Sequence, residues 1–268
     1  MGASSGSVRA VPRVLRILAA VPLAALASVG SSADRYEGLA YAKVDGKLVY
    51  RELHWRYEER GSPARLVVYR CPDGAPFARK RLHGDGDASV PDFEFVDGRD
   101  GYREGVRGDG DQREVFVQAR ADAGTQRRTL RIGPDSVVDA GFDALIRTRW
   151  DDLLAGDPVD AAFLLPSRFD FLDVSIRRLT PTDADDALVR LRMKLDAWYG
   201  FVAPQTDLAY RASDRWLLRF EGIGSIRDAR GRNQAVRIEF PPALHSPAVD
   251  RAEVDAALAV PLTGQCGG

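Results

Sequence analysis

The chain has 268 residues, of which 45% are hydrophobic and 29% are charged, and its formal net charge is −1. These values are typical of a globular protein and exclude a disordered or membrane-embedded one. The near-neutral charge gives no basis for a nucleic-acid partner, because phosphate binding needs clustered positive charge. Arginine greatly outnumbers lysine, which can signal phosphate or carboxylate recognition. This bias is also typical of a GC-rich genome, and we favour that interpretation.

The first 33 residues have the composition of a secretory signal peptide. A positive leader with three arginines precedes an uncharged apolar run over 17–29. This run is shorter than the ~20 apolar residues that span a bilayer, and Pro22 interrupts it. We therefore expect no stable transmembrane segment after cleavage. An uncleaved membrane anchor is the alternative interpretation.

The preferred cleavage site follows Ala33, because Ser31-Ser32-Ala33 has small residues at both positions that a signal peptidase reads. The alternative site follows Ala27. Cleavage at either site predicts a periplasmic or secreted protein. In that oxidising compartment Cys71 and Cys266 either pair or remain two unrelated thiols, and the sequence leaves both possibilities open.

Period-two alternation of apolar and polar residues predicts antiparallel strands with one buried face over most of the mature chain. The alternation is clearest over 189–196, where odd positions are apolar and even positions are charged. It recurs at two other places, 53–58 and 236–240. The continuous apolar run over 66–69 is typical of a strand covered on both sides. The parity changes within 169–176, which predicts a β-bulge near Leu172.

One segment has helical rather than strand periodicity. Apolar residues recur at helical spacing over 139–155, with Asp139 as the expected N-cap and Gly156 as the expected C-terminal stop. A second, shorter helix is expected after Ser246-Pro247, with the proline at its first position, ending near Ala259.

These elements predict a mainly β protein of the α+β class. We expect a curved antiparallel sheet, or half-barrel, packed on the central helix at 139–155, with a short C-terminal helix. Residues 1–33 would be the signal peptide, 34–132 a β-rich amino-terminal part, and 133–268 the helix with the second group of strands. A single domain over 34–268 is the alternative division.

The sequence contains no recognisable catalytic, metal-binding or cofactor-binding signature. The three histidines do not have metal-ligand spacing, and His54 falls on a polar position of its expected strand, which indicates a solvated side chain. Gly222-Ile223-Gly224 lacks the third glycine of a dinucleotide-binding motif, and no nucleophile elbow follows residue 33. We therefore predict no catalytic residues, no metal site and no cofactor, and favour a protein that is not an enzyme.

Aromatic residues gather in the second half of the chain and supply the one candidate site. If the sheet closes only partly around the helix, some of them would line an apolar cleft suited to an acyl chain or a hydrophobic peptide. The residues predicted to bind such a ligand are Trp150, Phe163, Phe171, Trp198, Phe201 and Trp216. A filled core is the alternative role, because large rings mostly serve burial.

The second half also resembles the periplasmic half-barrel proteins of the lipoprotein-carrier (LolA/LolB-like) kind. The resemblance covers residues 135–240, and it is carried by the expected helix at 142–147, by Ala155-Gly156-Asp157-Pro158, and by 212–216 leading into 236–240. It implies a curved antiparallel sheet around helices, no catalysis, and an apolar cavity for lipid or an acylated protein. The chain differs in its longer strand-rich amino-terminal half and in having no lipid-attachment cysteine.

The leading functional hypothesis is an exported, non-enzymatic envelope protein that binds a hydrophobic ligand or an acylated partner in a half-barrel cavity. The first alternative is a structural or protein-interaction envelope protein with a filled core and no ligand. The second alternative is a hydrolase without a recognisable motif.

Overall fold

The structure is a computed structural model that describes residues 1–3, 6, 33–84, 89–180, 187–195 and 205–266. Most of the expected signal peptide lies outside these residues, so the leader and its cleavage stay predictions. The division into 34–132 and 133–268 also stays a prediction.

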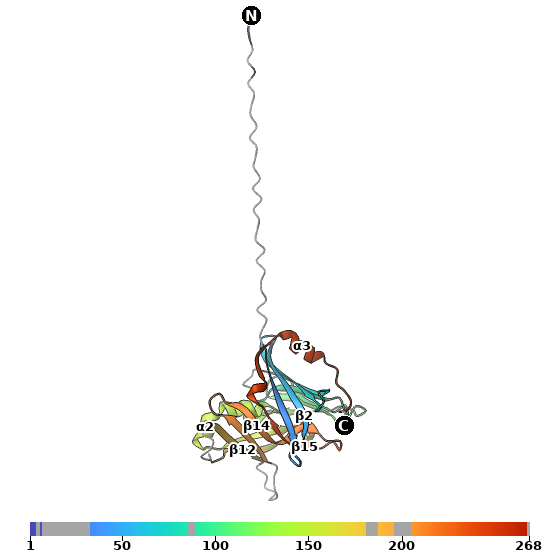
Figure 1. The fold of residues 1–268 in the computed structure, drawn as a ribbon, viewed down its shortest axis with the longest axis vertical. Coiled ribbons are helices and arrows are strands. Elements are labelled where there is room, and N and C mark those ends of the chain that lie inside the picture. Colours follow the sequence, from blue (N-terminus) through green and yellow to red (C-terminus); the bar gives the residue numbers. More distant parts are fainter. Residues whose placement is uncertain (4–5, 7–32, 85–88, 181–186, 196–204, 267–268) are drawn as a thin grey trace.

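Sixteen strands form one large curved sheet (Figure 1). Eight of them come from the first half of the chain and pair antiparallel in sequence order. They are β1 (Ala33–Ala42), β2 (Leu48–Glu59), β3 (Ser62–Arg70), β4 (Pro76–His83), β5 (Asp92–Asp97), β6 (Arg103–Arg107), β7 (Gln112–Gln118) and β8 (Gln126–Arg131).

The remaining strands come from the second half of the chain. They are β9 (Ser136–Val137), β10 (Val159–Leu165), β11 (Asp170–Arg178), β12 (Leu188–Leu195), β13 (Gln205–Arg211), β14 (Trp216–Arg227), β15 (Asn233–Glu239) and β16 (His245–Val249). β1 joins the halves, because it pairs with β2 along one edge and with β15 and β16 along the other. β9 runs parallel to β10, so the expectation of a purely antiparallel sheet is wrong there.

The strands predicted from alternation are confirmed. In β12, Val189 and Leu191 are buried and Arg190 between them is exposed. In β15, Val236 and Ile238 are buried and Arg237 between them is more exposed. The run over 66–69 is fully buried, as expected for a strand covered on both sides. Leu66 and Val68 face one cluster and Val67 and Tyr69 face another.

The β-bulge expected near Leu172 is absent from this described pair of strands. β10 and β11 pair in one register from Val159–Ile176 to Leu165–Asp170. Phe171 packs on the core beside its cross-strand partner Leu164, whereas Leu172 lines a cavity. The apolar pattern of β11 changes parity because both faces of this strand carry apolar side chains, and not because a residue is inserted.

The single helix expected over 139–155 is instead two short helices, α1 (Gly141–Thr148) and α2 (Trp150–Ala155). The expected N-cap, Asp139, lies outside α1 with a φ of 48°, and Ala140 takes the N-cap position. Gly156 ends α2 in the left-handed conformation, as predicted. Ile146, Trp150 and Leu153 share a cluster with residues of four strands: Val159, Ile176, Val189, Leu191, Leu208 and Tyr210.

The C-terminal helix, α3 (Arg251–Ala259), begins later than expected. Ser246 and Pro247 belong to β16, and the N-cap is Asp250, whose carboxylate accepts a hydrogen bond from the Ala252 N–H at 3.0 Å. Val254 of α3 packs against β2 and β3, far from α2 (Figure 1). None of the helices within the described ranges is long and apolar enough to cross a bilayer.

The C-terminal tail is tied to the first half of the sheet. Cys71 and Cys266 form a disulfide bond with their Cα atoms 5.4 Å apart, which answers the question that the sequence left open. The Thr263 N–H also donates to the Pro76 carbonyl at 2.7 Å. The tail therefore crosses the start of β4.

The two halves of the sheet face each other across an interior. The short 3-10 helix η1 (Pro166–Arg168), which follows β10, contacts β6 and β7 of the first half. Phe169 then packs in the same cluster as Val106 and Val115. Side chains therefore bridge two groups of strands that are far apart in the order of the sheet.

Candidate functional site

A cavity of about 800 Å³ lies between the two halves of the sheet, and we call it the interior cavity. Known small-molecule sites span about 300–1,000 Å³, so its size suits a small ligand. Its first wall comes from β1 to β6 and its second from α1 and β10 to β15. The two walls differ in chemistry.

The second wall is largely apolar. Strand alternation turns Leu172 and Val174 of β11 toward the cavity, and Met193 of β12 lies in the same wall. Neighbouring elements add further apolar side chains, Phe142, Phe163, Leu195, Leu217 and Phe220. The charged residues of this wall are Asp143 and Arg147 of α1 and Arg227 of β14.

The first wall carries ionisable groups at paired positions of neighbouring strands. One such row crosses β1 to β4 through Asp34, Arg56, Arg65 and Leu82. The next row crosses β1 to β4 through Tyr36, His54, Val67 and Lys80. Because paired positions share a face of the sheet, the charged groups of the two rows lie on the same inner surface.

Lys80 is buried, with 5% of its surface exposed. Its ammonium group donates to Asp139 Oδ1 at 2.5 Å and to Ser225 Oγ at 2.9 Å. Asp139 is therefore the counter-ion of Lys80 rather than a helix cap. Its other oxygen, Oδ2, is buried without a hydrogen-bond partner among the described residues.

His54 is buried rather than solvated, with 7% of its surface exposed. Its Nε2 lies 3.0 Å from Glu52 Oε2, and its ring stacks on Tyr36 at 4.5 Å. Burial lowers the pKa of His54 and outweighs the opposing hydrogen bond to Glu52. The expectation was wrong because both faces of β2 are covered, so the polar parity of this strand faces the cavity instead of water.

Other charged groups of the first wall are held by specific partners. Arg56 donates from Nε to Asp34 Oδ1 at 2.8 Å, and its guanidinium carbon lies 5.4 Å from the centres of the Tyr36 and Trp216 rings. Burial raises the pKa of Glu104, although that carboxylate accepts a hydrogen bond from the Tyr102 hydroxyl at 2.7 Å.

The structure brings together only some of the residues predicted to bind a ligand. Phe163 and Trp216 line the interior cavity. Trp150 is buried away from it, with its ring 5.7 Å from that of Tyr210, and Phe171 packs on the core. Trp198 and Phe201 lie outside the described residues.

The sequence analysis missed Arg65, which lines the interior cavity from β3. A signal was present, because Arg65 has the same parity as Val67 and Tyr69 in a strand predicted to be covered on both sides. Strand alternation therefore places its side chain on an enclosed face. The many arginines were attributed to genome composition, so Arg65 was not considered as a residue of the cavity.

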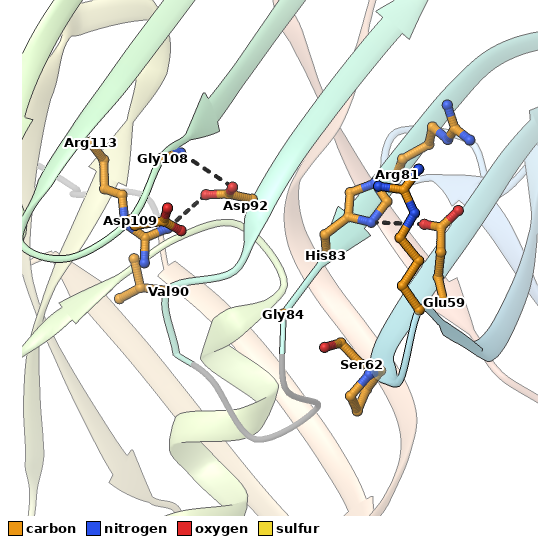
Figure 2. Close-up of a pocket in the computed structure, with 12 residues that line it drawn as sticks. Glu59, Ser62, Arg81, His83, Gly84, Val90, Asp92, Gly108, Asp109 and Arg113 are labelled. Atoms are coloured by element: carbon orange, nitrogen blue, oxygen red, sulfur yellow. Dashed lines mark hydrogen bonds and ion pairs between the residues drawn. The ribbon is translucent and has the colours of Figure 1, made fainter.

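A second cleft lies at the ends of β2 to β6 (Figure 2). On one side His83 Nδ1 lies 3.0 Å from Glu59 Oε2, and on the other Asp92 accepts a hydrogen bond from Arg113 at 2.6 Å. Each of these charged groups already has a partner within the cleft, and the His83 side chain is 47% exposed to solvent. The interior cavity is therefore the stronger candidate for a ligand-binding site. Within the described ranges no group of three or more potential metal-ligating side chains gathers.

Comparisons with known proteins add a distant structural similarity. No protein-family model and no curated protein matches the chain. The fold is similar, with a TM-score of 0.42 and 8% identity, to the crystal structure of a beta-barrel-like protein of the domain of unknown function DUF1849 from Brucella abortus. The alignment covers 79% of this chain and 98% of that chain. So low a similarity identifies no shared ligand or activity.

Proposed function

We propose that the protein is an exported, non-enzymatic binding protein whose interior cavity holds an amphiphilic molecule or the acyl chain of a partner. One observation carries the proposal, namely that a single cavity joins an apolar wall to a wall of ionisable groups. An apolar tail would contact Phe163, Leu172 and Val174, while a polar head would face the first wall. Ligand sites commonly combine an apolar lining with a few polar groups that fix orientation.

The proposed binding form is a half-barrel that curves over α1 and α2 and leaves the rest of its interior open. Two strands support this arrangement. Ile176 of β11 and Val189 of β12 contact the helix cluster, whereas Val174 and Met193 farther along the same strands line the cavity. The helices therefore fill one part of the interior and leave another for a ligand.

Export to the periplasm or beyond is part of the proposal. The composition of residues 1–33 supports it, and so does the disulfide between Cys71 and Cys266, because disulfides persist mainly in oxidising compartments. Cell fractionation with an antibody against the native protein tests the location. Recovery of the full-length chain in the cytoplasm would contradict export.

Binding is tested with the protein purified from an oxidising compartment. Native mass spectrometry detects a co-purified amphiphile, and a fluorescent fatty acid measures uptake by the cavity. Leu172→Trp places a larger side chain in the cavity wall and should weaken probe binding about fivefold or more, because overpacking costs about 1–3 kcal/mol. The matched control is Leu154→Trp on α2, since Leu154 is 37% exposed and lies outside the cavity lining.

Equal probe affinity in the two variants would contradict binding in the interior cavity. Failure of the wild-type protein both to carry an amphiphile and to take up the probe would favour the alternative of a structural protein without a ligand. Turnover of an ester substrate that is lost on substitution of one cavity carboxylate would overturn the non-enzymatic part of the proposal.

A further inference from the structure

We infer that the ligand of the interior cavity is an anionic amphiphile whose carboxylate or phosphate head group binds the guanidinium of Arg65. The inference rests on the proposed function, because it requires that the cavity holds a ligand. It adds the charge of that ligand and the residue that recognises it.

Arg65 is partly buried on the inner face of β3. Its neighbours along the strand, Ala64 and Leu66, face the opposite surface and pack in the cluster with α3. Arg65 is paired across the sheet with Arg56 on β2 and with Leu82 on β4, and all three line the interior cavity. Its charged group therefore faces the cavity.

Within the described part of the chain, Arg65 has no hydrogen bond or ion pair. The other cations of the cavity wall are held by carboxylates, apart from the exposed Arg168. These ion pairs are Arg56 with Asp34, Lys80 with Asp139, Arg147 with Asp143, and Arg227 with Asp100. A guanidinium on this inner surface whose donors have no partner among the described residues favours an anion brought in from outside, because such an anion would accept hydrogen bonds from it.

The carboxylates that act electrostatically on Arg65, Asp143 and Asp139, already have other partners. Asp143 accepts hydrogen bonds from Arg147 at 3.0 Å and from the Tyr210 hydroxyl at 2.9 Å, one on each oxygen. Asp139 is engaged by Lys80 through Oδ1. Asp143 cannot turn to Arg65 without leaving Arg147 or the Tyr210 hydroxyl unpaired. Asp139 Oδ2 has no hydrogen-bond partner among the described residues, and it forms no hydrogen bond with Arg65.

The residue opposite Arg65 on β2, Arg56, is also a cation. Arg56 and Arg65 are direct cross-strand partners on one face, and like charges at such positions repel each other. Asp34 pairs with Arg56 and with His245, and it forms no ion pair with Arg65. A carboxylate or phosphate beside Arg65 would offset the local repulsion between the two arginines and could accept two parallel hydrogen bonds from the guanidinium fork.

The apolar wall determines the rest of the ligand. Leu82 and Phe93 lie at paired positions beside Arg65, and Phe163 and Leu172 lie in the second wall. A small inorganic anion would leave this apolar surface without contacts. An anion that carries an acyl or alkyl chain would cover it.

The test compares three ligands with the same chain, dodecanoate, dodecyl phosphate and uncharged dodecanol, by isothermal titration below their aggregation concentrations. The wild-type protein should bind at least one anion about thirtyfold or more tightly than dodecanol, as expected when a hydrogen-bonded charge pair forms in an enclosed site. Which anion binds more tightly distinguishes a carboxylate from a phosphate head group. Equal affinities for all three ligands would overturn the head-group assignment while leaving the proposed function intact.

Arg65→Met should remove this preference without weakening dodecanol binding. The matched control is Arg177→Met, which replaces an exposed strand arginine outside the cavity lining and should preserve the preference. Arg65→Lys keeps the charge without the planar fork and should give an intermediate preference. Unchanged preference in Arg65→Met would overturn the inference, whereas failure of the wild-type protein to bind any of the three ligands would overturn the proposed function itself.

Unliganded stability gives an independent measurement. The melting temperature of Arg65→Met should be no lower than that of Arg177→Met, because within the described residues Arg65 makes no hydrogen bond or ion pair that the substitution would remove. A melting temperature below that of the control would show that Arg65 has a structural role, and the inference would then fail.

Discussion

Lys80 and Asp139 form an ion pair inside the cavity, with 2.5 Å between Nζ and Oδ1, and this pair joins β4 to the segment that precedes α1. The two side chains are 6% and 13% exposed. Lys80→Met should destabilise the protein by about 3–5 kcal/mol, because it leaves the carboxylate of Asp139 enclosed without a counter-ion. Denaturant unfolding measures this difference.

Lys47→Met is the matched control, because Lys47 pairs with Asp45 at the surface and the two side chains are 81% and 44% exposed. It should change the unfolding free energy by less than about 1 kcal/mol. Similar losses in the two variants would contradict the structural role of the buried pair.

The Cys71–Cys266 bond should stabilise the sheet by holding the C-terminal tail against it. Replacing both cysteines with alanine should lower the unfolding free energy by about 2–5 kcal/mol. A reductant should lower the melting temperature of the wild-type protein and leave that of the double variant unchanged. Equal sensitivity of the two proteins to reductant would show that the disulfide is not the source of the effect.

His54 should make stability depend on pH near neutrality. Because burial lowers its pKa in the folded protein, the unfolded chain takes up a proton first as the pH falls. The stabilisation from neutral His54 is therefore full above about pH 6.5, the ordinary pKa of histidine, and is lost as the pH falls from there toward the folded-state pKa.

His54→Phe keeps a ring beside Tyr36 and removes the titrating group. The difference in unfolding free energy between wild type and this variant should change by at most about 1.4 kcal/mol per pH unit in that window. Denaturant unfolding at a series of pH values measures this difference. Parallel pH profiles for the two proteins would contradict a lowered pKa at His54.

The position of Ala33 bears on the cleavage site. Ala33 is 1% exposed, packs in the cluster that contains Trp55 and Val254, and pairs with Val249 of β16. Cleavage after Ala27 would keep these contacts, whereas cleavage after Ala33 would remove them. We therefore expect the site after Ala27 to be used, and mass spectrometry of the mature amino terminus checks this. A mature chain that begins with Asp34 would contradict the expectation.

The strands were the most predictable part of the fold. The face on which a side chain lies follows from its position along a strand, so alternation was sufficient to place Val189 and Leu191 inside. The run over 66–69 was also interpreted correctly as buried on both faces. Phe163 and Trp216 line the cavity, although the aromatic pattern alone could not separate them from the packed Trp150.

The charged groups of the cavity could not be predicted in this way. A polar residue that faces the inside of a curved sheet produces the same apolar–polar alternation as one that faces solvent. The sequence therefore predicted, wrongly, that the His54 side chain is solvated. Asp139 precedes a helix as an N-cap would, but its partner Lys80 is 59 residues away in the chain. These positions depend on which strands face each other, which local sequence patterns do not encode.

The first strand and the last but one, β1 and β15, meet at the centre of the sheet, where Leu39 pairs with Glu239. A polypeptide that leaves a membrane channel amino terminus first can therefore assemble the β1–β8 array early. The polypeptide cannot form the central β1–β15 pairing until β15 has left the channel. The interior cavity forms only after that step, so under the proposed export and binding its ligand would enter after β15 has crossed the membrane.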